Sequence, residues 1–137
     1  MDIRPLSDSF AVSPQIMPGD IPALKAAGFV RIICNRPDGE VPPELRAEQI
    51  RQAAEAAGLD FVDNQIVPGD FSDKIVTAQA AAMVAAGPVF AYCASGNRSS
   101  HAWALALAGQ RTADDLIGTA AQWGYNLEHL RPRLTRT

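Results

Sequence analysis

Residues 90–100, FAYCASGNRSS, decide how the rest of the chain is arranged. The stretch begins with apolar, β-prone residues and passes through a turn of small residues that contains Gly96. It then continues into residues 101–108, whose composition favours a helix. A strand that ends in a tight loop at a helix N-terminus points several backbone N–H groups into one hollow, where the helix dipole also favours an anion. The stretch therefore predicts an anion-binding loop after a buried strand.

Cys93 opens this loop and Arg98 closes it. A thiol over such a hollow is expected to ionise readily, because its thiolate is the anion that the loop stabilises. Arg98 adds a planar fork of donors that suits an oxyanion. A lone cysteine more often packs as a small hydrophobic residue, but the order strand, Cys, Gly, Arg, helix favours a nucleophile beside an anion cradle. The expected cradle consists of Ala94, Ser95, Gly96, Asn97 and Arg98.

Strand-like and helix-like segments alternate along the whole chain. Strands are expected near residues 3–6, 10–12, 29–34, 59–67 and 89–92, and helices over 21–27, 44–57, 73–86, 101–108, 112–123 and 126–130. Asp20, Thr112 and either Ser72 or Asp70 are the expected helix caps, and the chain is expected to fray after Pro132. This alternation predicts an α/β fold of three layers, with a mostly parallel central sheet flanked by helices. At 137 residues, the chain is expected to form one domain over 1–137.

Ligands of such sheets bind beyond the carboxyl ends of the strands. Two further loops are expected there, one with Asn35 and Arg36 and one with Pro68, Gly69 and Asp70. Arg36 is a candidate anion-binding residue, although most loop charges are only solvated. Cys34 ends its strand, where it is either a second thiol that resolves a persulfide or disulfide, or, as burial statistics favour, a core cysteine.

Composition excludes several classes of protein. The net charge of −3 leaves no basic surface for nucleic acid or an anionic membrane. No apolar run is long enough to cross a bilayer, and Asp2 and Arg4 interrupt any signal-peptide-like start. Two cysteines without a secreted-type framework favour the cytoplasm. The scattered Cys and His residues predict no metal site, no Gly-rich phosphate motif with Lys is present, and no cofactor is expected.

The loop resembles the active-site loops of two cysteine-enzyme groups. It is similar to that of tyrosine and dual-specificity phosphatases, but only four residues separate Cys93 from Arg98, one fewer than in those enzymes. Cys93, Gly96 and Ser99 also fit the loop of rhodanese sulfurtransferases. Nearly the whole chain resembles the phosphatase-like family of the bacterial beta-lactamase hydrolase-like proteins. The matching segments are residues 2–6, 12–16, 33–38, 67–69, the Cys93 loop and residues 124–127.

This resemblance implies a fold like that of the phosphotyrosine protein phosphatases, and a small anionic substrate. For a phosphatase, it implies that Cys93 attacks phosphorus, that Ser99 hydrogen-bonds the thiolate and that Asp70 protonates the leaving group. Asp63 and Asp73 are weaker candidates for the acid, and all three carboxylates could instead be capping or solvated residues. For a sulfurtransferase, it implies a Cys93 persulfide and no general acid.

The residues leave three functions open. The full-length resemblance and Asp70 favour a phosphatase, whereas the short loop is more typical of a sulfurtransferase that takes a sulfur donor. The phosphatases also carry His before the Cys, where this chain has Tyr92, and His101 is more often a packed or solvated helix residue than a catalytic one. A pocket that binds an anion without turnover is the non-enzymatic alternative, and it would not need a reactive thiol.

Overall fold

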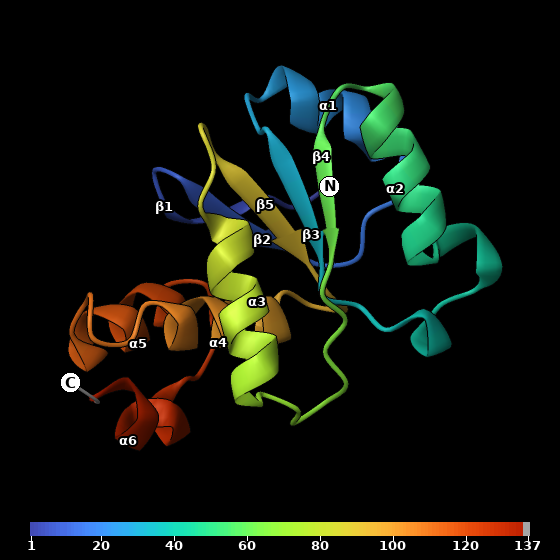
Figure 1. Ribbon diagram of the computed structural model, residues 1–137. Helices are drawn as coiled ribbons and strands as arrows, with labels where there is room; N and C mark the ends of the chain where they lie inside the picture. The colour runs from blue at the N-terminus through green and yellow to red at the C-terminus, as the bar shows by residue number, and fades with distance from the viewer. Residues whose placement is uncertain (136–137) are drawn as a thin grey trace.

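The computed structural model describes residues 1–135. Five short strands form one sheet in the order β1–β2–β5–β3–β4, in which β1 is antiparallel to β2 and every other pair is parallel (Figure 1). The strands are β1 (Arg4–Ser7), β2 (Phe10–Ser13), β3 (Arg31–Cys34), β4 (Asp60–Asp63) and β5 (Val89–Tyr92). The predicted mostly parallel sheet is therefore confirmed.

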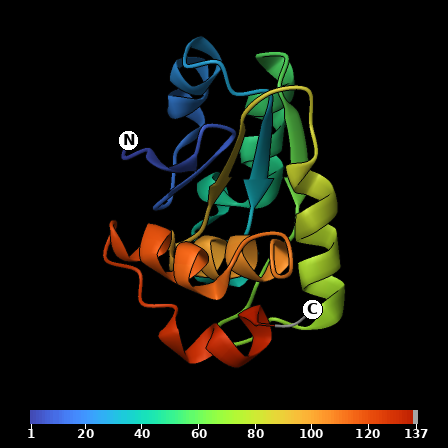
Figure 2. The same cartoon turned by 90° about the vertical axis from the view of Figure 1, so that its left-hand side faces the viewer.

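Helices cover both faces of the sheet, which gives the predicted three layers (Figures 1 and 2). One face carries α1 (Ile21–Ala26) and α2 (Ala47–Ala56). The other face carries α3 (Asp73–Met83), α4 (Asn97–Ala106), α5 (Ala113–Ala121) and α6 (Arg131–Leu134). Short 3-10 turns are η1 (Pro18–Asp20), η2 (Asp38–Glu40), η3 (Pro43–Leu45) and η4 (Glu128–Leu130).

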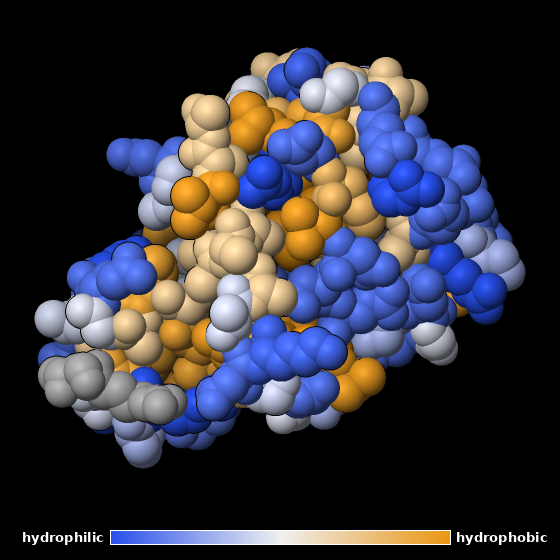
Figure 3. All heavy atoms as spheres, viewed as in Figure 1, coloured by the Kyte–Doolittle hydropathy of each residue, from blue (hydrophilic) through white to orange (hydrophobic). Residues whose placement is uncertain are grey.

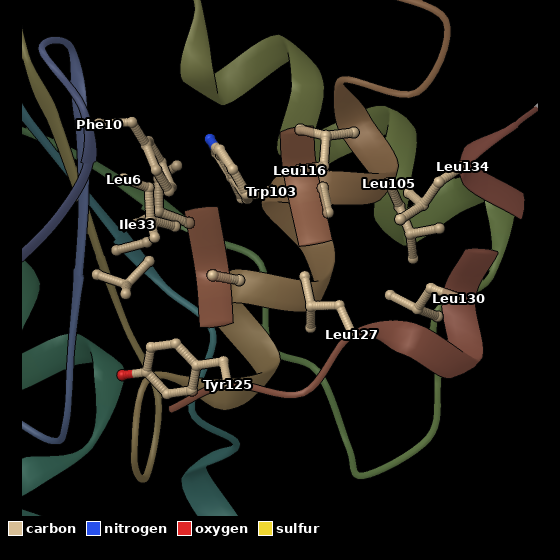
Figure 4. Close-up of a cluster of buried hydrophobic side chains, with 14 of the residues drawn as sticks. Leu6, Phe10, Ile33, Trp103, Leu105, Leu116, Tyr125, Leu127, Leu130 and Leu134 are labelled. Carbon is tan, nitrogen blue, oxygen red and sulfur yellow. The ribbon is translucent and has the colours of Figure 1, made fainter. Parts of the chain in front are cut away.

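The central strand β5 is buried on both sides. Phe90 and Tyr92 pack with the helices α1 and α2, whereas Val89 and Ala91 join the core that Trp103 of α4 and the C-terminal helices complete (Figure 4). Burial of each large apolar side chain contributes roughly 1.5–3 kcal/mol, so the two cores hold β5 firmly in the middle of the sheet. On the face seen in Figure 3, the α2 side is mostly hydrophilic, while the Ala-rich helix α3 presents a more hydrophobic surface.

Several element boundaries differ from those predicted. The helix α4 begins at Asn97, four residues earlier than residue 101, because Gly96 adopts a φ of +92° and ends the loop at once. The strand β4 ends at Asp63, after which the chain leaves the sheet, and α3 ends at Met83. The helix α2 begins only at Ala47, because the prolines before it form the separate turn η3.

The chain end and one cap also differ. The chain end that the sequence predicts to fray forms the helix α6 as far as Leu134, which is buried, and Pro132 occupies its first turn, where the missing N–H is tolerated. The last part of this prediction, residues 136–137, lies outside the described residues. Ser72 and Thr112 cap their helices as predicted. Asp20 makes no such cap, because its carboxylate accepts from the N–H of Met17 on the preceding turn.

Candidate active site

The Cys93 loop lies at the carboxyl edge of the sheet, between its two parallel neighbours. Tyr92, the last residue of β5, is paired with Ser13 of β2 and with Cys34 of β3. The N–H of Gln15 donates to the Ala94 carbonyl at 3.3 Å, and that of Asn35 donates to the Tyr92 carbonyl at 2.9 Å. Both flanking strands therefore hold the start of the loop.

Gly96 gives the loop its shape. Its φ of +92° is disfavoured for residues with a side chain, and it places the Gly96 N–H 3.1 Å from the Sγ of Cys93, to which it donates. The Ser95 hydroxyl accepts from the N–H of Asn97 at 3.3 Å, directly before the first turn of α4. Cys93 is buried, whereas the rim residues Ala94, Ser95 and Asn97 are exposed.

The guanidinium of Arg98 is held by the carboxylate of Glu40, which no motif in the sequence predicts. Nη2 and Nη1 of Arg98 donate to the two carboxylate oxygens of Glu40 at 2.7 and 2.9 Å, and Nη1 also donates to the Ile66 carbonyl at 2.7 Å. Arg36 donates to the same carboxylate at 3.0 Å through Nε. Hydrogen bonds from Arg98, and then from Arg36, hold the pKa of the Glu40 carboxyl below its usual value despite partial desolvation. The structure thus brings Arg36 and Arg98 together on Glu40, and their role in binding a substrate anion stays a prediction.

Ser99 does not have the position expected of a thiolate donor. Its hydroxyl donates to Oδ1 of Asn35 at 2.9 Å, in a buried amide network. Asn35 in turn bonds Gln79 of α3, and Gln79 also accepts from Asn64 at 2.9 Å. The sequence placed Asn35 beside a possible anion, but its amide is fully buried in this network. These side chains tie α4 and α3 to the ends of β3 and β4 beneath the loop.

The loop that carries Asp70 lies against α4. Arg98 holds its start at Ile66, and the ring of Phe71 stacks on that of His101 with 5.2 Å between centroids. Asp70 itself is exposed in a turn, where its N–H donates to the Val67 carbonyl. The alternatives Asp63 and Asp73 lie at the end of β4 and in the first turn of α3.

Cys34 and His101 are both packed side chains in this structure. Cys34 is buried among the residues between the sheet and α2, and burial raises the pKa of its thiol to about 11. Its Sγ lies 3.3 Å from the Arg36 carbonyl, to which it donates. His101 bonds the Asn97 carbonyl at 2.7 Å and the ring of His129 at 3.1 Å, and burial lowers the pKa of its imidazole.

Two side chains for which the sequence predicted no role also contact the loop. They are Arg4, near the N-terminus, and Tyr125, near the C-terminus. Tyr125 donates from its hydroxyl to the Ser95 carbonyl at 2.8 Å, and Arg4 donates to that hydroxyl at 2.7 Å. Both belong to the segments that carry the family resemblance, residues 2–6 and 124–127. Their place in these segments was the one signal that could have drawn attention to them.

The part of the chain that the structure describes contains neither a cluster of potential metal ligands nor a membrane-spanning helix. Residues 1–135 contain no group of three or more His, Cys, Asp or Glu that could hold a metal ion. Within the same residues, no helix combines the length and the apolar character needed to span a bilayer.

Comparison with known families gives a specific match. Residues 2–110 match the model of the family described as "Beta-lactamase hydrolase-like protein, phosphatase-like domain". The chain belongs to this family. A beta-lactamase hydrolase-like protein of Agrobacterium fabrum is 33% identical over 125 residues. That match covers 89% of this chain but only 29% of the relative, so this chain spans less than a third of that protein's length.

Solved structures confirm the fold. A candidate phosphatase from Neisseria meningitidis superposes with a TM-score of 0.83 at 33% identity, and the match covers 98% of this chain and 97% of that one. Kinase associated phosphatase, solved with its catalytic-site cysteine replaced by serine, has a TM-score of 0.69 at 15% identity, with 92% and 83% of the two chains covered. The phosphotyrosine phosphatase-like fold that the sequence predicted is therefore established for this domain.

Proposed function

We propose that this phosphatase-like domain hydrolyses phosphate monoesters of small anionic substrates, with the thiolate of Cys93 as nucleophile. The observation that carries the proposal is the position of Cys93. It directly follows the central strand and lies three residues before Gly96, which is the N-cap of α4 and donates a hydrogen bond to its sulfur. The family of this chain and the catalytic-site cysteine of kinase associated phosphatase support the same chemistry.

The reaction would proceed in two displacements. The Cys93 sulfur attacks phosphorus, an S–P bond forms, the ester P–O bond breaks, and Asp70 gives its proton to the departing oxygen. Water then attacks phosphorus and loses its proton to Asp70, the S–P bond breaks, and phosphate and the free thiolate are released. Because Cys93 is buried, the exposed rim of the loop must open enough to admit the phosphoryl group.

Arg98 and Arg36 would bind the substrate oxyanion in exchange for Glu40. A carboxylate and a phosphoryl group offer the same pair of acceptor oxygens to a guanidinium fork. In this proposal, the Glu40 carboxylate holds the guanidinium groups of Arg98 and Arg36 in place when no substrate is bound. The more highly charged phosphoryl group of the substrate then replaces Glu40 in some of these hydrogen bonds.

Cys93→Ser and Asp70→Asn test this assignment with aryl phosphates. Cys93→Ser is expected to abolish turnover. Asp70→Asn is expected to lower kcat by about 10²–10⁴-fold for a basic leaving group and much less for an acidic one, because only the first needs a proton donor. The acidic leaving group is thus the matched control. Equal losses for both substrates would exclude Asp70 as the acid, and an active Cys93→Ser enzyme would refute the proposal.

A sulfurtransferase is the second candidate, and the four-residue spacing between Cys93 and Arg98 favours it. The same protein should then transfer sulfur from thiosulfate to cyanide, gain the mass of one sulfur atom on Cys93, and be indifferent to Asp70→Asn. A third outcome, in which phosphate or vanadate binds but neither reaction occurs, would identify a binding module without turnover.

A further inference from the structure

The peptide group that joins Ser95 to Gly96 is hydrogen-bonded at both ends. Its N–H, on Gly96, donates to the Sγ of Cys93 at 3.1 Å. Its carbonyl, on Ser95, accepts from the hydroxyl of Tyr125 at 2.8 Å. The group that stabilises the sulfur is therefore itself held by a side chain from outside the loop, in the segment between α5 and η4.

Arg4 of β1 adds a cation to this arrangement. Its Nη1 donates to the Tyr125 hydroxyl at 2.7 Å and lies 3.5 Å from the Ser95 carbonyl oxygen. Asp2 holds the other side of the guanidinium through bonds of 2.6 and 3.0 Å. All donors point in one direction, from Arg4 to the phenol, from the phenol to the carbonyl, and from the N–H of the same peptide to the sulfur.

Hydrogen bonds in such a chain strengthen one another. A cation that donates to a phenol oxygen makes the phenol O–H a better donor, and a strong donor at an amide oxygen shifts charge along the conjugated peptide. The N–H of that peptide then interacts more strongly with an anion than with a neutral acceptor. The arrangement therefore stabilises the thiolate of Cys93 more than its thiol.

Packing fixes the phenol against the loop. A Cβ atom on Gly96 would lie 2.1 Å from the Tyr125 hydroxyl oxygen, so this oxygen rests directly on the glycine backbone. The Tyr125 side chain is buried, and Figure 4 shows that its hydroxyl points out of the hydrophobic cluster while its ring remains beside it. A phenol in this position has little freedom to leave the Ser95 carbonyl.

We propose that Tyr125 and Arg4 are positioning residues, which favour the thiolate of Cys93 through the Ser95–Gly96 peptide. This inference rests on the proposed function in so far as that function uses a Cys93 thiolate. The titratable and charged groups around the loop are Tyr125, the Arg4–Asp2 pair from the N-terminal segment, Arg98 from α4, and Glu40 and Arg36 from the connection between β3 and α2.

The test is a titration of the thiolate by its ultraviolet absorbance, without any substrate. Cys34→Ser serves as the background, and the same protein with Cys93→Ser is subtracted, so that only Cys93 is observed. Tyr125→Phe keeps the ring and removes the hydroxyl. We expect it to move the midpoint of the Cys93 titration upward by about half a pH unit, which is about threefold less thiolate below the midpoint.

Tyr92→Phe is the matched control. Tyr92 is also buried and is the neighbour of Cys93, but its hydroxyl lies beside Cys34 and takes part in none of the hydrogen bonds of the Cys93 loop. This variant should leave the titration unchanged. An unchanged midpoint in Tyr125→Phe, or equal shifts in both variants, would overturn the proposal.

A double-mutant cycle tests the order of the chain. If Arg4 acts through the phenol, Arg4→Met in the Tyr125→Phe protein should shift the midpoint much less than Arg4→Met in the otherwise intact protein. Additive shifts would mean that Arg4 acts on the sulfur directly, and would contradict the relay. A protein without phosphatase activity could still give the expected titration, and an active phosphatase could fail to give it, so the two proposals fail separately.

Discussion

The close contact between Gly96 and Tyr125 leads to a prediction for Gly96→Ala. An alanine at a φ of +92° costs roughly 1–2 kcal/mol, because its Cβ approaches the backbone. The same Cβ would lie 2.1 Å from the Tyr125 hydroxyl oxygen and 3.0 Å from its ring carbon, and such overpacking typically costs about 1–3 kcal/mol. The phenol must move, which also removes its bond to Ser95, worth about 1 kcal/mol.

The expected loss for Gly96→Ala is therefore about 3–6 kcal/mol, or a Tm lower by roughly 10–20 °C for a chain of this length. The control is Gly28→Ala, which has a φ of +97° but no atom within 4 Å of the added Cβ, so it should cost only about 1–2 kcal/mol. Tyr125→Phe should recover part of the loss in the Gly96→Ala protein and none in the Gly28→Ala protein. Equal destabilisation by the two alanines, measured by thermal or urea unfolding, would refute the reasoning.

Three further predictions follow from named contacts. Arg98→Lys should weaken vanadate binding by about tenfold or more, because a point charge cannot replace the fork, and unchanged affinity would assign Arg98 a structural role only. The pKa of His101 is lowered in the folded protein, so the unfolded chain binds more protons between that lowered value and about 6.5. Stability should therefore decrease as the pH is lowered through this window, and His101→Gln should make the Tm depend less on pH there. Gln79→Leu should cost about 2–5 kcal/mol in urea unfolding, because it removes three buried hydrogen bonds to the side chains of Asn35 and Asn64. The exposed Gln52→Leu should change stability by less than about 0.5 kcal/mol.

The sequence was sufficient to predict the centre of the fold. Residues 89–92 are apolar on both faces, which is typical of a central parallel strand. The short loop of small residues after them leads directly into a helix. The position of Cys93 at the carboxyl edge follows from these two facts. The exact start of α4 could not be predicted, because it depends on the left-handed backbone of Gly96 and not on the composition of the helix.

The partners of the site residues were much harder to predict. Glu40 and Arg98 are 58 positions apart, and Glu40 lies in a loop where most carboxylates are solvated, so nothing local distinguishes it. Gln79 of α3 is buried, and its partners Asn35 and Asn64 follow two different strands. The family resemblance implies a hydrogen bond from Ser99 to the thiolate, whereas its hydroxyl donates to Asn35. Contacts of this kind depend on the distances between helices and strands, and the hydrophobic periodicity of the sequence does not specify these distances.

The Glu40 contact changes the electrostatic argument for Cys93. The sequence predicts that Arg98 offers its fork of donors to an oxyanion, but both of its terminal nitrogens face the Glu40 carboxylate at hydrogen-bonding distance. A carboxylate at 2.7 Å offsets much of the guanidinium's field at a third group, since the two opposite charges act on that group from nearly the same place. Neutral donors that point at the sulfur are not offset in this way. We therefore expect the ionisation of Cys93 to depend more on the Gly96 N–H, and on the Tyr125 and Arg4 side chains behind it, than on Arg98, which we propose binds an anion in exchange for Glu40.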